Sequence, residues 1–318
     1  PSISSGDRKD DYPQINLIRE ISSQHNQVQR VFVGRENITA KLVSFCIENK
    51  GAIVLRGESG RGKTSVVAQV AKIVSEKMNR SNNQALLVRF LGTTPSTSTS
   101  EAVVASMLMQ LMAAFPEVAS EVLDGSDTSI SNSADRFLQL IRALASRDCK
   151  ICIILDSVDQ LDDTDPWRES YDQWLPPLFG PGALDNVTIL LSVLPSHSGK
   201  IEEMTFHNIV DLPVFTSEEG KQMIEKLCES HSRRLEEKQQ NKILTNFEHQ
   251  KSAMFLKLCF EQSLRWASWH DHVQVPSTVD GQISLLFWQL GHDFGQYLVR
   301  SFISHMTIAR GGLSQKEL

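Results

Sequence analysis

The chain has 318 residues, of which 41% are apolar and 22% charged, and its net charge is −6. This length exceeds what one hydrophobic core usually serves, so we expect two or more domains. The negative charge offers no electrostatic footprint for nucleic acid or for an anionic membrane. The sequence also has no run of about 18 apolar residues and no signal-peptide pattern at its start. We therefore expect a cytoplasmic protein with neither nucleic-acid nor membrane partners.

The cysteines are few, odd in number and mostly set in apolar runs, which predicts reduced core residues. They are Cys46, Cys149, Cys152, Cys228 and Cys259. Two of them, Cys149 and Cys152, form a CxxC that could indicate a metal or redox site. This CxxC leads into a strand, and no second CxxC or paired histidine follows at zinc spacing. We therefore predict that both cysteines belong to the core.

After a polar start, the chain alternates between strand-like and helix-like apolar patterns as far as residue 214. Residues 1–30 begin polar and charged, which favours a linker with one short helix. An apolar triplet, Val31 to Val33, then precedes Gly34-Arg35-Glu36, a pattern typical of a short strand and turn. From there, helical spacing predicts helices near 38–47, 66–74, 104–115 and 137–144, and continuous apolar runs predict strands at 51–56, 85–91, 151–156, 187–193 and 209–214. Alternating strands and helices predict a parallel α/β sheet that binds its ligand at the carboxyl ends of the strands.

A glycine-rich segment, Gly57-Glu58-Ser59-Gly60-Arg61-Gly62-Lys63-Thr64, separates the first of these strands from the next helix. It has every fixed position of a P-loop in the required strand–turn–helix context. Its glycines let successive N–H groups face phosphate oxygens, and the helix N-terminus adds partial positive charge. Lys63 can reach the β- and γ-phosphates, and the Thr64 hydroxyl can ligate Mg²⁺. We assign nucleotide binding to Gly57, Glu58, Ser59, Gly60, Arg61, Gly62, Lys63, Thr64 and Ser65.

A second landmark is Asp156, which closes the apolar strand 151–156. A carboxylate at this position beside a P-loop strand can hold Mg²⁺ directly or through water. Asp159, three residues later, could orient or deprotonate an attacking water. We therefore assign catalysis to Lys63, Asp156 and Asp159, and metal binding to Thr64 and Asp156. The alternative, an acidic surface loop, is the interpretation that we adopt for Asp162, Asp163 and Asp165.

The pattern changes from Thr216. Thr216 and Glu219 form a capping box that opens a helix, a charged stretch follows at 233–242, and residues 253–266 form an apolar helix pattern. Strand patterns are absent here, which predicts a separate helical domain. From Pro276 a third piece begins, in which apolar spacing traces one long helix over 283–306. Because a further helix pattern starts after Gly312, we expect this third piece to be truncated.

With these motifs in view, the chain resembles the STAND class of P-loop NTPases, in the NACHT type found ahead of WD or TPR repeats in animal signalling proteins. The resemblance covers roughly residues 31–318. It is carried by Val33-Gly34-Arg35-Glu36, by Arg89-Phe90-Leu91-Gly92-Thr93-Thr94, by Asp156-Ser157-Val158-Asp159-Gln160-Leu161 and by Phe255-Leu256-Lys257-Leu258.

The resemblance implies a fold and a nucleotide. The fold is a parallel five-stranded sheet of the ASCE type, followed by an all-α domain and the start of a winged-helix domain. The implied domains are a linker (1–30), the NTPase domain (31–213), the helical domain (214–275) and the winged-helix start (276–318). It also implies that Val33, Gly34 and Arg35 line the adenine site.

Such proteins hold ADP in a closed monomer, exchange it for ATP and self-oligomerise to activate an attached effector. The effector and sensor domains would lie outside these 318 residues.

Three departures from the family pattern put efficient hydrolysis in doubt more than nucleotide binding. The arginine usual at the tip of the fourth strand is missing around Leu194, which leaves Ser192 or Ser196 as weaker candidates. The proline of the helical domain is missing from 252–254, and Gln160 stands where a second acidic residue often lies. The implied activity is therefore weak ATP hydrolysis by a nucleotide-controlled switch.

Two other function classes stay open. A ring-forming mechanochemical ATPase needs an arginine finger, and the sequence does not assign that role among Arg61, Arg89, Arg168 and Arg310. The second open class is a scaffold in which the nucleotide is purely structural. A regulatory GTPase is disfavoured, because no Asn-Lys-x-Asp motif follows the P-loop.

Overall fold

The computed structural model of the protein describes residues 31–48, 51–78, 83–93, 97–123, 132–162, 165, 184–197, 208–270 and 273–309. These residues form two compact units. The first holds the described residues within 36–58 and 63–212, and the second holds those within 31–35, 59–62 and 213–309. The predicted linker, the predicted third-piece terminus, Asp163, Arg168 and Arg310 lie outside the described residues.

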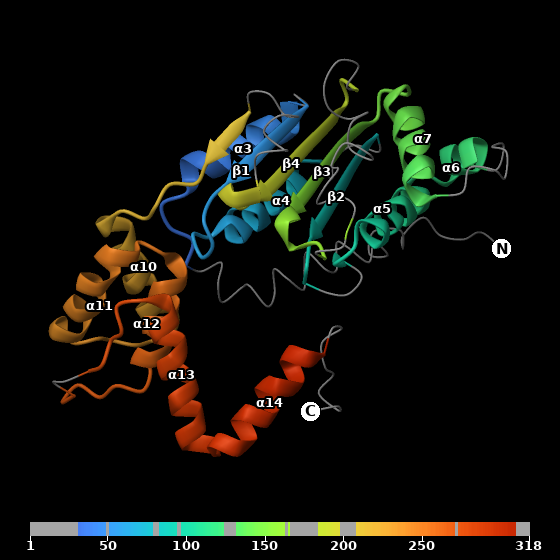
Figure 1. Ribbon diagram of the computed structural model, residues 1–318. Coiled ribbons are helices and arrows are strands. Elements are labelled where there is room, and N and C mark those ends of the chain that lie inside the picture. The colour runs from blue at the N-terminus through green and yellow to red at the C-terminus, as the bar shows by residue number, and fades with distance from the viewer. Residues whose placement is uncertain are drawn as a thin grey trace, which may run out of the picture. The chain divides into compact units, whose positions relative to one another are not determined.

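The first unit is built on a five-stranded parallel sheet (Figure 1). The strand order is β2-β3-β4-β1-β5, so the P-loop strand lies inside the sheet. The strands are β1 (Ala52–Arg56), β2 (Gln84–Phe90), β3 (Lys150–Asp156), β4 (Val187–Val193) and β5 (Ile209–Asp211). The predicted parallel α/β sheet is confirmed, although β5 ends three residues before the predicted bound because it pairs only along part of β1.

Helices cover both faces of this sheet. On one face α5 (Ser100–Ala114), α6 (Pro116–Leu123) and α7 (Ser133–Ala145) share a core with alternate residues of the strands. Most of the other strand residues are also buried, and α3 (Glu36–Glu48) and α4 (Lys63–Met78) contact β4 and each other. Covering on both faces explains why the strands read as continuous apolar runs. Helix α6 was not predicted, because eight residues opening on a proline give too short a periodic pattern.

The cysteines are all free thiols, and the CxxC pair is buried as predicted. Burial raises the pKa of the Cys149 thiol to about 11. A hydrogen bond with Cys46 of α3 raises the pKa of Cys152 well above its usual range, with burial adding to the effect. Thiols with raised pKa values are poor nucleophiles and poor metal ligands, which agrees with a core role.

No single helix among the described residues has both the length and the apolar character of a membrane span. Helices α5 and α6 satisfy that test only as a pair, across a bend of 116°.

The second unit is helical. Its helices are α10 (Ser217–Ser230), α11 (Glu237–Gln250), α12 (Ala253–Ser263), α13 (Val279–Phe294) and α14 (Gln296–Ile308). The predicted capping box of α10 is present, with Thr216 and Glu219 each accepting from the other's backbone N–H. The first three helices share one apolar core that includes Ile224, Phe247 and Phe255.

The predicted single helix over 283–306 is wrong, because it breaks into α13 and α14 at Gly295. The φ of Gly295 is +91°, which ends α13, and its N–H donates to the Gly291 carbonyl. Figure 1 shows the two helices meeting at this bend. Their apolar side chains are largely exposed, with Trp288 at 65% and Tyr297 at 88%. The winged-helix start stays a prediction.

Close packing of α10 on α11 makes Gly220 sensitive to substitution. A Cβ atom at this position would lie 2.3 Å from Cε1 of the buried Phe247 ring. We expect Gly220→Ala to lower the free energy of unfolding by about 2 kcal/mol, because overpacking a core forces side chains or backbone to shift. Urea denaturation checks this value. The matched control is Gly291→Ala, whose Cβ would meet no atom closer than 3.4 Å and which we expect to be neutral or stabilising by up to about 1 kcal/mol.

Candidate functional site

The P-loop begins where β1 ends at Arg56, and α4 begins at Lys63. The Gly57 N–H donates to the Val193 carbonyl at 3.3 Å, which joins the loop to the end of β4. The Lys63 ammonium group is buried and donates to the carbonyls of Gly57 at 2.6 Å and Glu58 at 3.3 Å. The loop therefore holds its own lysine in place at the start of the helix, where a phosphate can compete for it.

Asp156 ends β3 with only 2% of its surface exposed. Burial raises the pKa of its carboxyl group, and this effect is opposed by hydrogen bonds from Ser192, Thr64 and Ser157 and by the charge of Lys63. The structure thus brings Lys63, Thr64 and Asp156 together at one edge of the sheet, as the motifs predicted. Their catalytic and metal-binding roles stay predictions.

Ser192 of β4 is a direct hydrogen-bond partner of Asp156. Its hydroxyl donates to Asp156 Oδ1 at 2.5 Å and accepts from the Ser157 N–H at 2.8 Å. The sequence had suggested Ser192 only as a substitute for a missing arginine. The register of β3 and β4 could have indicated this contact. Leu155 pairs with Leu191, so Asp156 and Ser192, the next residue of each strand, lie side by side.

Asp159 is 96% buried, with 4% of its surface exposed. One carboxylate oxygen accepts from the Leu194 N–H at 3.0 Å, and the other accepts from Gln160 Nε2 at 2.8 Å. The carboxylate therefore joins the segment after β3 to the end of β4. Its predicted role in positioning water stays a prediction.

One acidic residue departs from its prediction. Asp165, which we expected on a surface loop, is buried at 6% exposure, and its carboxylate accepts from the Ser100 N–H at 2.7 Å. Ser100 is the first residue of α5, whose N–H groups lack partners within the helix. The burial of Asp165 therefore follows from satisfying this helix terminus. Asp162 is exposed, as predicted.

The donors present in the first unit fit a magnesium–nucleotide complex. Within the described ranges, no three His, Cys, Asp or Glu side chains come together as a self-sufficient metal site. Mg²⁺ beside a nucleotide requires less, because it keeps several waters and takes one or two protein oxygens together with phosphate oxygens. The Thr64 hydroxyl and the Asp156 carboxylate, whose pKa Thr64 lowers, would be the two protein oxygens at such a site.

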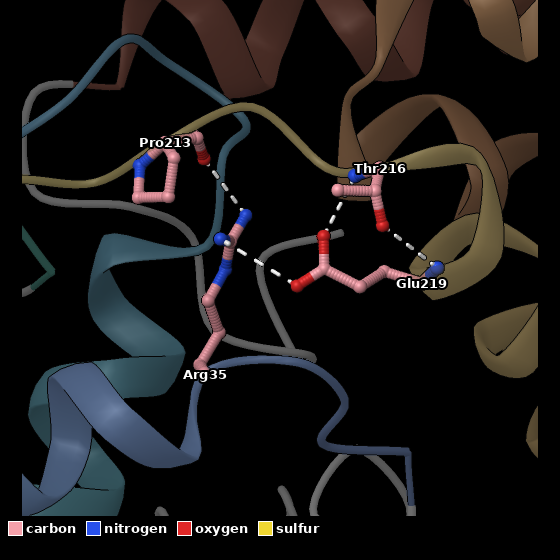
Figure 2. A network of polar contacts seen from close by, with 4 residues as sticks. All are labelled: Arg35, Pro213, Thr216 and Glu219. Atoms are coloured by element: carbon pink, nitrogen blue, oxygen red, sulfur yellow. Dashed lines mark hydrogen bonds and ion pairs between the residues drawn. The ribbon is translucent and has the colours of Figure 1, made fainter.

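The motif Val33-Gly34-Arg35 packs inside the second unit, where Figure 2 shows Arg35 beside the capping box of α10. Arg35 donates to the Pro213 carbonyl at 2.8 Å, and its Nη1 lies 4.0 Å from Glu219 Oε1. Its guanidinium also lies 4.3 Å from the centre of the Phe215 ring. At Gly34, whose φ is +69°, a Cβ atom would lie 2.0 Å from the Glu219 carboxylate. The motif is thus shaped to accept Glu219; its predicted contact with adenine stays a prediction.

Gly60 of the P-loop belongs to the second unit, where it contacts the N-terminus of α12. Its carbonyl accepts from the Met254 N–H and from the Ser252 hydroxyl, both at 3.2 Å. Ser252 is the N-cap residue of α12, but its hydroxyl makes no capping bond within the helix. The Gly60 carbonyl therefore satisfies one of the free N–H groups at this helix terminus. Residues 252–254, which lack the proline expected in the helical domain, therefore contact the P-loop through Ser252 and Met254.

The Arg35 contacts predict an unequal response to two substitutions. We expect Arg35→Ala to lower the free energy of unfolding by about 2–3 kcal/mol, because it removes a buried charge-assisted hydrogen bond and the contact with Phe215. Glu219→Gln should cost under about 1 kcal/mol, since glutamine retains an acceptor for the Thr216 N–H and loses only the 4.0 Å ion pair. Urea denaturation of both variants measures the two costs. Equal losses of unfolding free energy in the two variants would show instead that the Arg35–Glu219 ion pair accounts for most of the stabilisation by Arg35.

Comparison with known proteins places this geometry in a family. The family model for the NACHT domain matches residues 52–231, which is more than half of the chain. The chain belongs to the NACHT domain family. This assignment confirms the family resemblance that the motifs indicated, and the NTPase fold implies a nucleotide and typically Mg²⁺.

Two curated relatives carry the same domain. The chain is 28% identical over 281 residues to NACHT and WD repeat domain-containing protein 2 of Mus musculus, covering 84% of this chain and 15% of that protein. It is 25% identical over 315 residues to NACHT domain- and WD repeat-containing protein 1 of Homo sapiens, covering 95% of this chain and 19% of that protein. The chain thus spans less than a fifth of the length of these relatives.

Solved structures support the fold. The Aeropyrum pernix ORC2 protein, in ADPNP–ADP complexes, matches 80% of this chain and 69% of its own with a TM-score of 0.51 and 13% identity. The Aeropyrum pernix ORC1 protein, in complex with DNA, matches 89% of this chain and 74% of its own, also with a TM-score of 0.51 and 13% identity. At this identity the likeness shows the fold alone, which is that of nucleotide-binding ATPases.

Proposed function

We propose that this NACHT domain is a nucleotide-controlled signalling switch of the STAND class. It would bind ADP or ATP with Mg²⁺, hydrolyse ATP slowly, and control the self-oligomerisation and activation of an effector outside these 318 residues in the cytoplasm. The WD repeats in the names of its relatives support attached sensor or effector domains.

The observation that carries the proposal is the desolvated Asp156 carboxylate, held beside Thr64 and Lys63 at the end of the P-loop. Burying a carboxylate at a strand end costs stability, so a protein retains one there only when the charge serves another purpose. Binding of a Mg²⁺–nucleotide complex is such a purpose, because the metal replaces the hydration that the carboxylate has lost.

The residues of the site would divide the work. Lys63 would transfer its hydrogen bonds from the loop carbonyls to phosphate oxygens, which adds a charge-assisted contact without moving the helix. Thr64 and Asp156 would hold Mg²⁺, whose chemistry when bound is to neutralise charge on the phosphates. Asp159 already accepts bonds from Leu194 and Gln160. Asp159 would orient the attacking water with the lone pairs that these two bonds leave open.

Denaturing the purified protein and identifying the released nucleotide by chromatography tests the proposal. Co-purified ADP, together with binding of added ADP or ATP by calorimetry, would support a switch. A folded protein that binds neither nucleotide would overturn the proposal. A nucleotide that stabilises the fold strongly but never exchanges would instead indicate a structural ligand.

Turnover separates the switch from a ring-forming ATPase. We expect steady-state ATP hydrolysis well below about 1 s⁻¹, the low end of ordinary enzyme rates. A phosphate-release assay measures this rate, and turnover at or above that value would favour the mechanochemical class.

A further inference from the structure

The fully buried Ser192 occupies an unusual position in β4. Its strand neighbours Leu191 and Val193 are apolar, as expected for a strand covered on both faces. An apolar residue at position 192 would bury without cost, whereas a hydroxyl requires partners. Ser192 has two, the Asp156 carboxylate and the Ser157 N–H. Its hydroxyl is therefore retained for these contacts and not for the stability of the strand.

The two hydrogen bonds give the Ser192 hydroxyl one orientation. A backbone N–H can only donate, so the Ser157 N–H occupies a lone pair of the hydroxyl oxygen. The single hydroxyl proton then points to Asp156 Oδ1 at 2.5 Å. On the other carboxylate oxygen, the Ser157 hydroxyl lies at 3.4 Å, which is a weak contact.

The backbone of Ser157 is shaped to make this arrangement. Its φ and ψ are 59° and 53°, in the left-handed region that residues other than glycine rarely adopt. Backbone strain of this kind persists only where surrounding contacts determine it, and it gathers at functional sites. Here it lies between the metal-binding candidate Asp156 and the short helical turn Val158–Gln160.

We propose that Ser192 is a positioning residue for the nucleotide site: its hydroxyl, held by the Ser157 N–H, fixes the orientation in which Asp156 supports Mg²⁺. Ser192 itself touches neither nucleotide nor metal in this role. Because it acts only through Asp156, its role rests on the nucleotide site proposed above. Residues that orient a metal ligand in this way typically change metal affinity by about 10- to 100-fold when they are substituted.

The test compares nucleotide binding with and without the metal. ADP affinity is measured by calorimetry in EDTA and in Mg²⁺ for wild type, Ser192→Ala and Ser192→Thr. We expect Ser192→Ala to reduce the Mg²⁺-dependent gain in affinity by about tenfold, with ADP affinity in EDTA within about twofold of wild type. Threonine keeps the hydroxyl and suits a strand, so Ser192→Thr should restore most of the gain. Ser192→Cys, with a weak donor of similar size, serves if the alanine variant fails to fold.

The matched control is Ser146→Ala, at the end of α7, where the hydroxyl is exposed and donates to the Ala143 carbonyl. It should leave both affinities unchanged. Equal losses in EDTA and Mg²⁺ for Ser192→Ala would show a general structural role and overturn the proposal, as would a Mg²⁺ gain unaffected by alanine or cysteine. Ser192→Ala should reduce the Mg²⁺-dependent gain in the wild-type background and have no further effect in an Asp156→Asn background. That result would confirm that Ser192 acts through Asp156. Wild type that binds no ADP under either condition would instead reject the proposed function.

Discussion

A Lys63→Ala variant is expected to bind ADP about a hundredfold more weakly than wild type. The ammonium group is buried at the start of α4 and already hydrogen-bonded to the loop carbonyls of Gly57 and Glu58. Its transfer to phosphate oxygens needs no reorganisation of the helix. Removing a charge-assisted contact of this kind costs about 3 kcal/mol, and roughly 1.4 kcal/mol corresponds to each factor of ten in affinity. Calorimetry with ADP and Mg²⁺ measures the loss.

The matched control for this variant lies on the same helix. Lys77 is exposed near the end of α4, and Lys77→Ala changes the net charge by the same amount. We expect its ADP affinity to stay within about twofold of wild type, because an exposed charge at that distance is screened by solvent. Lys63→Ala binding within about threefold of wild type would place the nucleotide somewhere other than the P-loop. Circular dichroism of both variants confirms that the fold is retained.

The sequence predicted the sheet because the central strands β1, β3 and β4 are buried on both faces. A continuous apolar run such as Ile151 to Leu155 has few alternatives to a central parallel strand. Helices were predicted where their apolar stripes were long, as in α4, and missed where they were short, as in α6. The break at Gly295 was missed because apolar spacing continues across it, although glycine is the residue that helix termini favour.

The residues of the candidate site were predictable in part. Motif spacing identified Lys63, Thr64 and Asp156, since a P-loop and a strand-end carboxylate have few other uses. The contacts that orient them were less accessible. Arg35 donates to a carbonyl 178 positions later in the chain, and no local pattern encodes such a contact. The left-handed backbone of Ser157 also depends on its surroundings, because serine has no intrinsic preference for that conformation.

The second large effect is expected from Asp156→Asn, which should separate stability from metal binding. Burial raises the pKa of the Asp156 carboxyl group in the folded protein, so the ionised form is unfavourable there. Asparagine removes that cost, and we expect the nucleotide-free variant to gain about 1 kcal/mol of stability, the usual scale of gain when a functional residue is replaced by a better-tolerated one. The same change removes the proposed metal ligand, so the Mg²⁺-dependent gain in ADP affinity should fall by at least about tenfold.

The stability difference between wild type and Asp156→Asn should depend on pH with a definite sign. Between the ordinary value of 3.8 and the raised pKa, the unfolded chain has lost the Asp156 proton while the folded protein still holds it. Wild-type stability therefore falls with rising pH across this window relative to Asp156→Asn, and the advantage of asparagine grows and then stays constant. Bound Mg²⁺ favours the carboxylate, so the metal-dependent gain in ADP affinity should increase across the same window. Urea denaturation of both proteins, with calorimetry in Mg²⁺, measures these trends. An asparagine variant less stable than wild type at neutral pH would show that the carboxylate is there to hold the fold together, and the case for a metal site at Asp156 would lose its physical basis.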